Sequence, residues 1–508
     1  MFLLFVVLPV FYVFGDTVLN WTSLYNNLAS FDLSNLELLL KSILIASMVG
    51  FISTILGVII GFLIYKTNLR GRNFFKVVLL LPLFIAPYIW AVAWKDLFYL
   101  MFNNTNFIYS VSGMILVLTT VFTPLSFLII GSALANIDSA MEESGLVITK
   151  FGRVVVKIIL PLIKTAIFTS FVLVFIFSIS EFSVPAFLGV QVFTTEIFKQ
   201  FSAFYNHSLA VFQSMLLVVI CMVLLVTERK YISGSPFLSI GSKGTTSKTY
   251  QLQSKNKYGY LFIGFWFVAS ILLPLIILVS QAFRNGIGIL EKAFVLLLPT
   301  FFTSFILALS GAALIVVIGF AVAYFTFRNP GTEMKKIFDW TLLIVFAIPS
   351  IIFAISLIKF YNRPAFNFIY AGFAIIVIGY AGKFSFISYK VIENSLKQIP
   401  KSFLEVASLE GIKPLSQLWN IIFPFVLPAM LASFVIGFVF SLEELGMTIM
   451  LYPPGSEIMP IKVFTIMANA PQSLTSSMIL IVFSITLFTI LIFYLIVNMF
   501  LKKYYLPE

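Results

Sequence analysis

Histidine and cysteine are almost absent from this sequence, which holds one of each, His207 and Cys221, among 508 residues. A single cysteine excludes an internal disulfide, and the apolar run around Cys221 predicts a buried thiol. One histidine and one cysteine also exclude a His/Cys metal cluster of the usual kind. Since no nucleophile–base pair is evident either, an enzyme is the least favoured class of function.

A phosphate-binding loop is also missing. Such a loop needs a glycine-rich run that ends in Gly-Lys followed by Ser or Thr. The only Gly-Lys pair, Gly382-Lys383, precedes Phe384 and has no matching glycine upstream. We therefore expect that the chain hydrolyses no ATP and binds no cofactor of its own.

Charged residues are scarce as well. They make up 10% of the chain and hydrophobic residues 60%, whereas a soluble domain has about 25% charged residues. A helix needs about 20 apolar residues to cross a bilayer. Such runs lie near residues 2–15, 40–65, 77–97, 112–135, 166–187, 209–227, 259–281, 297–327, 338–360, 367–392, 426–448 and 474–500. They predict an all-α, multi-pass membrane protein with about twelve transmembrane helices.

The net charge of +12 does not indicate nucleic acid as a partner, because basic residues collect on the cytoplasmic side of membrane proteins. They follow the second, fourth, eighth and tenth runs, whereas the loops 16–39, 98–111 and 188–208 hold few of them. This pattern predicts that both termini are cytoplasmic. The segment from Met1 to Gly15 lacks the positive start and cleavage site of a signal peptide, so we expect a transmembrane helix there.

The chain also contains an internal repeat. A segment rich in Ser, Gly, Thr, Lys and Gln, residues 228–258, divides it midway and predicts a flexible cytoplasmic linker. On each side an acid, Glu142 or Glu405, precedes a proline, Pro161 or Pro424, by the same spacing (161 − 142 and 424 − 405, both 19). Twenty residues after each proline, a second acid is expected inside an apolar helix: Glu181 in SISEFSV and Glu444 in SLEELGM. The halves therefore repeat with a constant offset in residue number (405 − 142, or 263) and share one orientation, which predicts a path at their interface.

The cytoplasmic segment EVASLEGIKPLSQLWNIIFPFVLPA resembles the EAA loop of permeases from binding-protein-dependent ABC importers. Glu405, Ala407, Gly411 and Pro424 fall on the family's positions, and Val406 replaces one small residue. The resemblance implies a type I importer permease fold of two six-helix halves, in which this loop docks into a separate ATPase. Close approach needs small residues, a glycine turns the chain, and the proline is expected to end one element. The alternative is an ordinary amphipathic loop that lies on the membrane.

The implied organisation has five parts. A first transmembrane helix and outer loop (1–37) precede the first permease domain (38–227) and the linker (228–258). A seventh helix and outer loop (259–297) then precede the second permease domain (298–500). The partners implied are two copies of a cytoplasmic ABC ATPase, which uses the ATP, an extracytoplasmic binding protein and the lipid bilayer.

The first loop departs from the family pattern. Glu142, Ser144 and Pro161 match it, but Ile148 stands where the family has its glycine. Gly145 and Gly152 are the nearby candidates for the turn, and we expect the two ATPase contacts to be unequal.

Ionisable residues inside membrane helices usually face a cavity or a partner. Glu181 and Glu444 are therefore candidates for lining the path or holding the halves together. The alternative is that they are carboxylates at helix ends near the outer surface.

Over nearly its whole length the chain is similar to the fused permeases of ferric-iron importers. The segments that support this are LPLFIAPYIWAVAW, EFSVPAFLG with FTTEIF, and SLEELGMTIMLYPPGSEIMPIKVFTIM. Related permeases for thiamine, polyamines and phosphonates share parts of them. From another class, a twelve-helix transporter driven by an ion gradient explains the helix count and the repeat, but not the equal spacing of acid and proline in the two loops.

Overall fold

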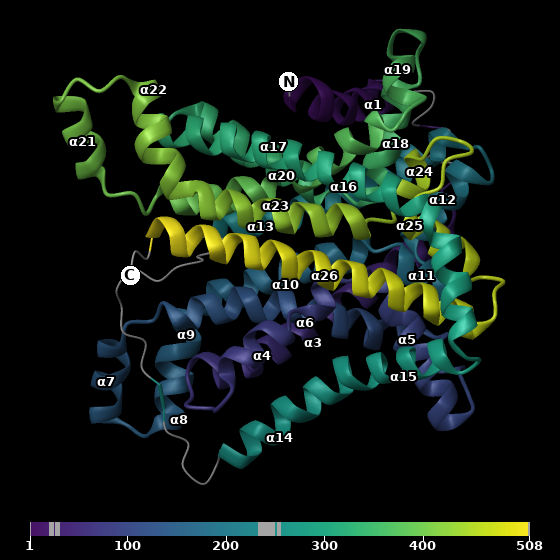
Figure 1. Cartoon of the computed structure of the whole chain (residues 1–508), viewed down its shortest axis with the longest axis horizontal. Coiled ribbons are helices and arrows are strands. Elements are labelled where there is room, and N and C mark those ends of the chain that lie inside the picture. Colours follow the sequence, from purple (N-terminus) through teal and green to yellow (C-terminus); the bar gives the residue numbers. More distant parts are fainter. Residues whose placement is uncertain (1, 20–24, 26–30, 232–248, 251–255, 506–508) are drawn as a thin grey trace. The chain divides into compact units, whose positions relative to one another are not determined.

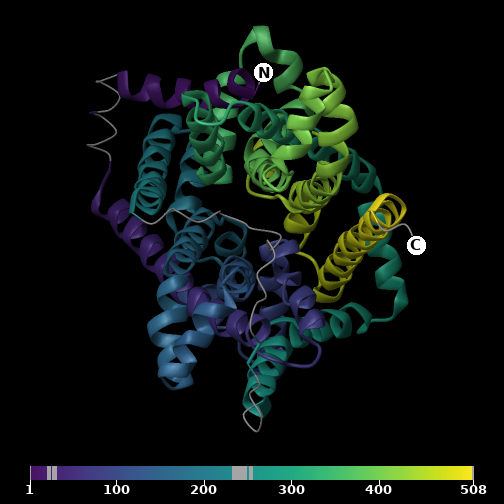
Figure 2. The same ribbon diagram turned by 90° about the vertical axis from the view of Figure 1, so that its left-hand side faces the viewer.

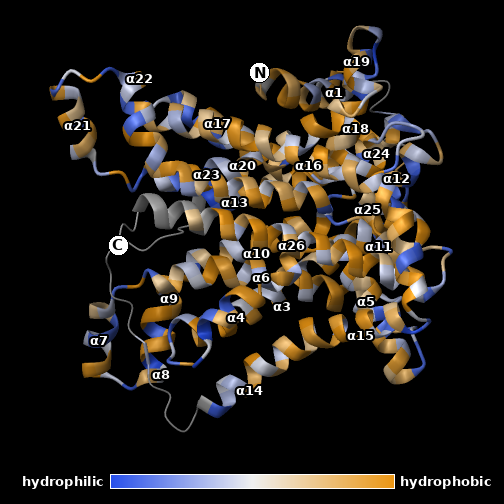
Figure 3. Ribbon diagram, in the orientation of Figure 1, coloured by the Kyte–Doolittle hydropathy of each residue, from blue (hydrophilic) through white to orange (hydrophobic). Residues whose placement is uncertain are grey.

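The structure is a computed structural model that describes residues 2–19, 25, 31–231, 249–250 and 256–505 (Figure 1). Most of the predicted linker 228–258, and much of the predicted first outer loop, lie outside these residues. The described part contains eight helices long and apolar enough to cross a membrane, and up to eleven spans if three bent helix pairs count as one span each. A shorter apolar helix covers Leu4–Thr17. Hydrophobic residues predominate along the long helices, as Figure 3 shows.

The chain divides into two compact units. The first unit comprises Thr17–Leu290 and Pro471–Ser477, and the second comprises Met1–Asp16, Glu291–Ala470 and Met478–Glu508. Within each unit the axes of several long helices are roughly aligned, and some of these helices are seen nearly end-on in Figure 2. In the second unit the Tyr361 hydroxyl donates to the carbonyl of Phe5 at 2.8 Å, which fixes the N-terminal segment.

The helices numbered α3 to α15 belong to the first unit. They are α3 (Leu33–Tyr65), α4 (Arg72–Val78), η2 (Leu81–Phe84), α5 (Pro87–Phe102), α6 (Val111–Ala135), α7 (Ser139–Ile148), α8 (Phe151–Val154), η3 (Val155–Ile159), α9 (Leu160–Leu162), α10 (Lys164–Ser180), α11 (Ser183–Leu188), α12 (Phe193–Ser202), α13 (His207–Tyr231), α14 (Asn256–Phe267), η5 (Val268–Leu272) and α15 (Leu273–Phe283). α3, α6 and α10 pack on one another and form the centre of this unit.

The remaining helices lie wholly or mainly in the second unit. They are η1 (Leu3–Val7), α1 (Leu8–Leu19), α16 (Ile287–Arg328), α17 (Glu333–Ala347), α18 (Ser350–Tyr361), η6 (Pro364–Phe366), α19 (Asn367–Tyr370), α20 (Ala374–Leu396), α21 (Lys401–Leu409), α22 (Pro414–Gln417), η7 (Leu418–Ile422), α23 (Phe423–Glu443), α24 (Thr448–Leu451), α25 (Met459–Ile466) and α26 (Gln472–Tyr505). α20 packs on α17 and α23 here.

The helix boundaries repeat with the offset found in the sequence. The starts of α5 and α18 differ by this offset (350 − 87), and so do the starts of α6 and α20 (374 − 111). The ends of α10 and α23 differ by the same amount (443 − 180). The prediction of two homologous helical halves is confirmed by this repeat of boundaries.

Two of the predicted single spans are broken. The run 77–97 corresponds to a pair of helices, Arg72–Phe84 and Pro87–Phe102, bent by 100°, and the run 338–360 to Glu333–Ala347 and Ser350–Tyr361, bent by 105°. A residue before proline is disfavoured in the helical region, and Ala86 and Ile348 both have extended ψ angles, 132° and 128°. Pro87 and Pro349 are the residues of the sequence that indicate these two breaks.

The expectation that the motif proline ends an element is wrong in the second half. Pro424 lies inside a continuous helical span, Pro414–Glu443. A π-turn precedes the proline in both halves, η3 and η7, in which Leu160 and Phe423 donate to the carbonyl five residues earlier. Proline has no N–H to donate, and the widened turn lets the helix continue. In the first half the span then bends by 61° between Leu162 and Lys164.

Glycines permit close helix contacts in both halves. A side chain at Gly57 of α3 would lie 2.5 Å from Ser126 of α6, and one at Gly319 of α16 would lie 2.3 Å from the hydroxyl of Ser388 of α20. Membrane helices associate through such small residues because lipid offers no hydrophobic drive between them. These crossings place α6 and α20, and hence the loops that follow them.

Candidate coupling and pathway sites

Glu142, predicted to contact an ATPase, is fully buried at the start of α7. Asp138 caps this helix, its carboxylate accepting from the Ala140 N–H at 3.0 Å. The Lys66 ammonium, just after α3, contacts one carboxylate oxygen of Glu142, and the Tyr250 hydroxyl donates to the other. The structure therefore places this acid inside the fold and not on the surface of α7.

The exposed part of α7 is apolar at its C-terminal end. Val147 and Ile148 are 88% and 85% exposed. Ser144 is exposed, and its hydroxyl donates to the Met141 carbonyl at 3.0 Å. The helix ends through extended Thr149, with φ −145°. Since Ile148 is not in the left-handed region, no glycine is required at its position.

Neither candidate glycine makes the turn in the first half. Gly145 lies inside α7, where a Cβ would meet Ile158 at 2.4 Å, so it permits close packing against η3. Gly152 lies inside α8. Neither has a positive φ, so the hypothesis that they supply the turn is wrong. Pro161 is exposed in α9.

The second predicted coupling segment, α21, presents its motif acid to solvent. Glu405 is exposed, whereas Ala407 is 4% exposed. Gly411 follows the helix with φ +71°, a conformation that L side chains rarely adopt. Leu409 is 87% exposed. Pro424 is exposed in α23.

A buried glutamine holds the turn after α21. Gln417 of α22 accepts from the Arg328 guanidinium at 3.1 Å. Its amide nitrogen donates to the Ser408 hydroxyl at 3.2 Å and to the Ile412 carbonyl at 2.9 Å. The end of α16 is thereby connected to α21 through side-chain hydrogen bonds.

Glu181 and Glu444 lie just past the ends of α10 and α23, so the prediction that they lie within these helices is wrong and the alternative of carboxylates at helix ends fits. Glu181 accepts from the Ser183 N–H at 2.7 Å, and Glu444 accepts from the N–H groups of Met447 at 3.0 Å and Thr448 at 3.1 Å. A carboxylate at a helix start satisfies N–H groups that have no partner in the helix. Each acid thus connects a long helix to the short helix that follows, α11 or α24.

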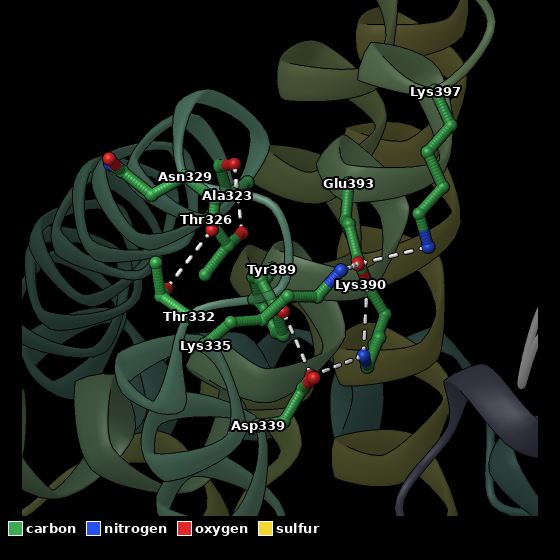
Figure 4. A network of polar contacts seen from close by, with 10 residues as sticks. All are labelled: Ala323, Thr326, Asn329, Thr332, Lys335, Asp339, Tyr389, Lys390, Glu393 and Lys397. Carbon is green, nitrogen blue, oxygen red and sulfur yellow. Dashed lines mark hydrogen bonds and ion pairs between the residues drawn. The ribbon is translucent and has the colours of Figure 1, made fainter.

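A charged network that sequence reasoning missed joins α17 to α20 (Figure 4). Lys390 contacts Asp339 at 2.6 Å and Glu393 at 3.0 Å, and the Tyr389 hydroxyl donates to Asp339 at 2.8 Å. Lys397 adds a contact to Glu393 at 2.9 Å. The i, i+3 and i, i+4 spacings of Lys390, Glu393 and Lys397 were the available signal. The network stabilises the last turns of α20, just before α21.

Asp96 of α5 is a second buried acid that the sequence did not single out. Lys95 lies 2.9 Å from one carboxylate oxygen, and the Ser476 hydroxyl donates to the other at 3.2 Å. Within the described ranges, no three His, Cys, Asp or Glu side chains converge as a metal site would require.

A cavity of about 390 Å³ in the first unit has apolar walls, which include Phe62, Leu134, Ile159 and Phe262. Such walls suit hydrocarbon more than an ion.

Two segments of the chain, residues 53–228 and 315–503, match the family model of the binding-protein-dependent transport system inner membrane component. Ferric transport system permease protein FbpB of Actinobacillus pleuropneumoniae is 25% identical over 448 residues, 81% of this chain and 64% of the relative. Fe(3+)-transport system permease protein FbpB 2 of Haemophilus influenzae is 28% identical over 422 residues, 82% of this chain and 81% of the relative.

A shorter similarity involves a protein named as a 2-aminoethylphosphonate transport system permease, PhnV of Salmonella typhimurium. It is 26% identical over 222 residues, 41% of this chain and 79% of the relative. This chain spans less than two thirds of the Actinobacillus protein. Because the two family matches cover most of its length, the chain is a multi-pass membrane protein that belongs to the family of binding-protein-dependent transport system inner membrane components and contains the family's domain twice.

Proposed function

We propose that the chain is the permease of an ATP-driven importer with ferric iron as its cargo. The observation that supports this most is the repeated pair of short helices, α7 and α21, each placed between long spans. Both expose large apolar side chains, Ile148 at 85% and Leu409 at 87%. Exposed apolar side chains on a short surface helix are typical of a site that another protein covers.

Two copies of a cytoplasmic ABC ATPase would dock on α7 and α21. Closure of the ATPase dimer moves these helices, and the movement reaches the spans through α6 and α20, so that the halves alternate access to the two sides. An extracytoplasmic binding protein delivers the cargo to the opposite face. Both termini lie in the cytoplasm, the chain binds no cofactor, and the ATP is used by the partner.

The names of the FbpB relatives support ferric iron as the cargo. Ferric iron is a hard cation that prefers oxygen ligands. The carboxylates of Glu181 and Glu444 accept backbone N–H groups, which supports a role in shaping the path more than in binding the ion. The PhnV similarity favours 2-aminoethylphosphonate as the second candidate.

The partner claim is tested by mass spectrometry of what co-purifies with the chain from mild-detergent membranes. We expect a stoichiometric pair of ATPase subunits, lost or reduced in Ile148→Glu and Leu409→Glu. Ile287→Glu, at another exposed isoleucine (72%), is the matched control and retains the pair. A chain that purifies alone from both wild-type and control membranes would contradict the proposal.

The cargo claim needs vesicles that contain the chain with the ATPase and binding protein that co-purify with it. Radiolabelled ferric citrate and 2-aminoethylphosphonate are supplied outside, with and without ATP inside. ATP-dependent uptake of iron alone supports the proposal, and uptake of the phosphonate alone moves the assignment to the second candidate. Uptake without ATP in response to an ion gradient would instead identify a secondary transporter.

A further inference from the structure

Tyr250, from the segment that joins the two halves, pairs with the chain that follows α3. Its N–H donates to the Lys66 carbonyl at 2.7 Å, and its carbonyl accepts from the Asn68 N–H at 3.2 Å. These two bonds form an isolated parallel bridge between Thr67 and Tyr250. Both backbone groups of Tyr250 are therefore used in holding this point of the joining segment against the end of α3.

The ring of Tyr250 packs between two aromatic side chains of the same unit. It stacks on Phe62 of α3 with centroids 6.5 Å apart, and meets Phe151 of α8 edge-on at 4.8 Å. The residue is 8% exposed and belongs to an apolar cluster with Leu134 and Val154. The cluster includes residues of α6 and α8, the helices on either side of α7.

The hydroxyl of Tyr250 completes the surroundings of a buried carboxylate. Glu142 and Lys66 have no exposed side-chain surface. A buried ion pair is favourable only when hydrogen bonds satisfy its remaining lone pairs. Lys66 contacts Oε1 of Glu142, and the Tyr250 hydroxyl donates to Oε2. Burial raises the pKa of Tyr250, and the negative charge of Glu142 raises it further, so the hydroxyl stays protonated as a donor.

The second half has no equivalent arrangement at the matching positions. Glu405, which corresponds to Glu142, is exposed, and Asn329 corresponds to Lys66. There the charged contacts join α20 to α17, from Lys390 of α20 to Asp339 of α17, and Lys390 also contacts Glu393 within α20. α21 itself is held through its Ser408 side chain, which accepts from the amide of the glutamine in α22.

We propose that Tyr250 is a positioning residue that fixes the first coupling helix, α7, to the end of α3 through Glu142. The joining segment thus makes α7 and α3 move together when the ATPase acts, whereas α21 is held through Gln417 of its own half. This rests on the proposed function for its consequence in transport, but the attachment of α7 is measurable without transport.

The test is hydrogen–deuterium exchange of the full chain in detergent, read on peptides over 139–148 and 401–409. Tyr250→Phe removes one hydrogen bond to a buried charge, and we expect about tenfold faster exchange over 139–148. Exchange over 401–409 serves as the internal reference and stays unchanged. Tyr258→Phe changes an exposed tyrosine (67%) and is the matched control, with wild-type exchange in both segments.

A double variant that lacks the ion pair distinguishes the effect of the Tyr250 hydroxyl from the effect of its ring packing. In Lys66→Met/Glu142→Met the carboxylate that accepts from Tyr250 is removed, so adding Tyr250→Phe should change exchange over 139–148 no further. An unchanged Tyr250→Phe single variant, or an equal effect in both backgrounds, would overturn the proposal. Faster exchange in a chain that binds no ATPase would uphold the attachment and contradict only the proposed function.

Discussion

Two glutamates at one motif position are in opposite surroundings. Glu142 is buried between Lys66 and Tyr250, while Glu405 is exposed on α21. The motif predicted an acid in each loop, but it could not predict that the partners of Glu142 lie 76 and 108 residues away in the sequence. Burial of an acid depends on such distant partners, and the spacing of residues within one motif does not predict them.

The burial of Lys66 and Glu142 predicts an asymmetric response to substitution. Lys66→Met leaves a buried carboxylate without a counter-charge, which should cost about 3–5 kcal/mol of unfolding free energy. Lys66→Met/Glu142→Met removes both charges and should recover most of that loss. Glu405→Gln, at the exposed matched acid, is the control with little effect. Thermal unfolding in detergent measures all three, and a double variant no more stable than Lys66→Met would refute the explanation.

Substitution of Gly411 by proline should abolish coupling to the ATPase without loss of the membrane fold. Its φ of +71° is incompatible with proline, whose ring fixes φ near about −65°. Gly411→Pro should therefore distort the end of α21 and abolish transport while the chain remains in the membrane. Glu405→Lys, which changes only an exposed charge, should also abolish transport if this acid contacts the ATPase. Normal uptake by both variants at normal abundance would contradict the coupling role.

At the scale of elements, α10 and α23 end at comparable positions in the two halves. α10 and α23 end next to acids, Glu181 and Glu444, that cap the short helices α11 and α24. The apolar runs of the sequence predicted that these helices exist, but not where they end. Hydropathy counts apolar residues, whereas an end depends on which backbone groups find partners.

Two substitutions of Glu444 distinguish a role in capping α24 from a role in binding the cargo. In Glu444→Gln the amide oxygen can still accept from the N–H groups of Met447 and Thr448. Glu444→Ala leaves these buried groups without a partner, at about 1–3 kcal/mol each. We expect near-normal uptake for Gln, and a lower unfolding temperature and reduced uptake for Ala. Equal loss of uptake in both variants, with Gln as stable as wild type, would assign the carboxylate to the cargo.

At the scale of the whole molecule, duplication was predictable and the differences between the copies were not. The offset between the halves was visible in Pro161 and Pro424, and it recurs in the helix boundaries. The copies differ where a few polar side chains changed: a buried ion pair holds α7, and Gln417 holds the turn after α21. Both halves keep long apolar runs in spite of such changes. Apolar runs therefore predict the shared fold, but they do not predict the unequal polar contacts.

The distribution of basic residues predicts the topology, and cysteine labelling can test it. The single native cysteine is buried, so the unmodified chain provides a low background. Val147→Cys and Leu409→Cys, at positions 88% and 87% exposed, should react with an impermeant maleimide only in inverted vesicles. Phe204→Cys, at an exposed position (65%) in the predicted outer loop 188–208, should react only in right-side-out vesicles. Because α7 and α21 must meet ATPases on one side of the membrane, labelling of Val147→Cys and Leu409→Cys from opposite sides would contradict both the parallel repeat and the importer.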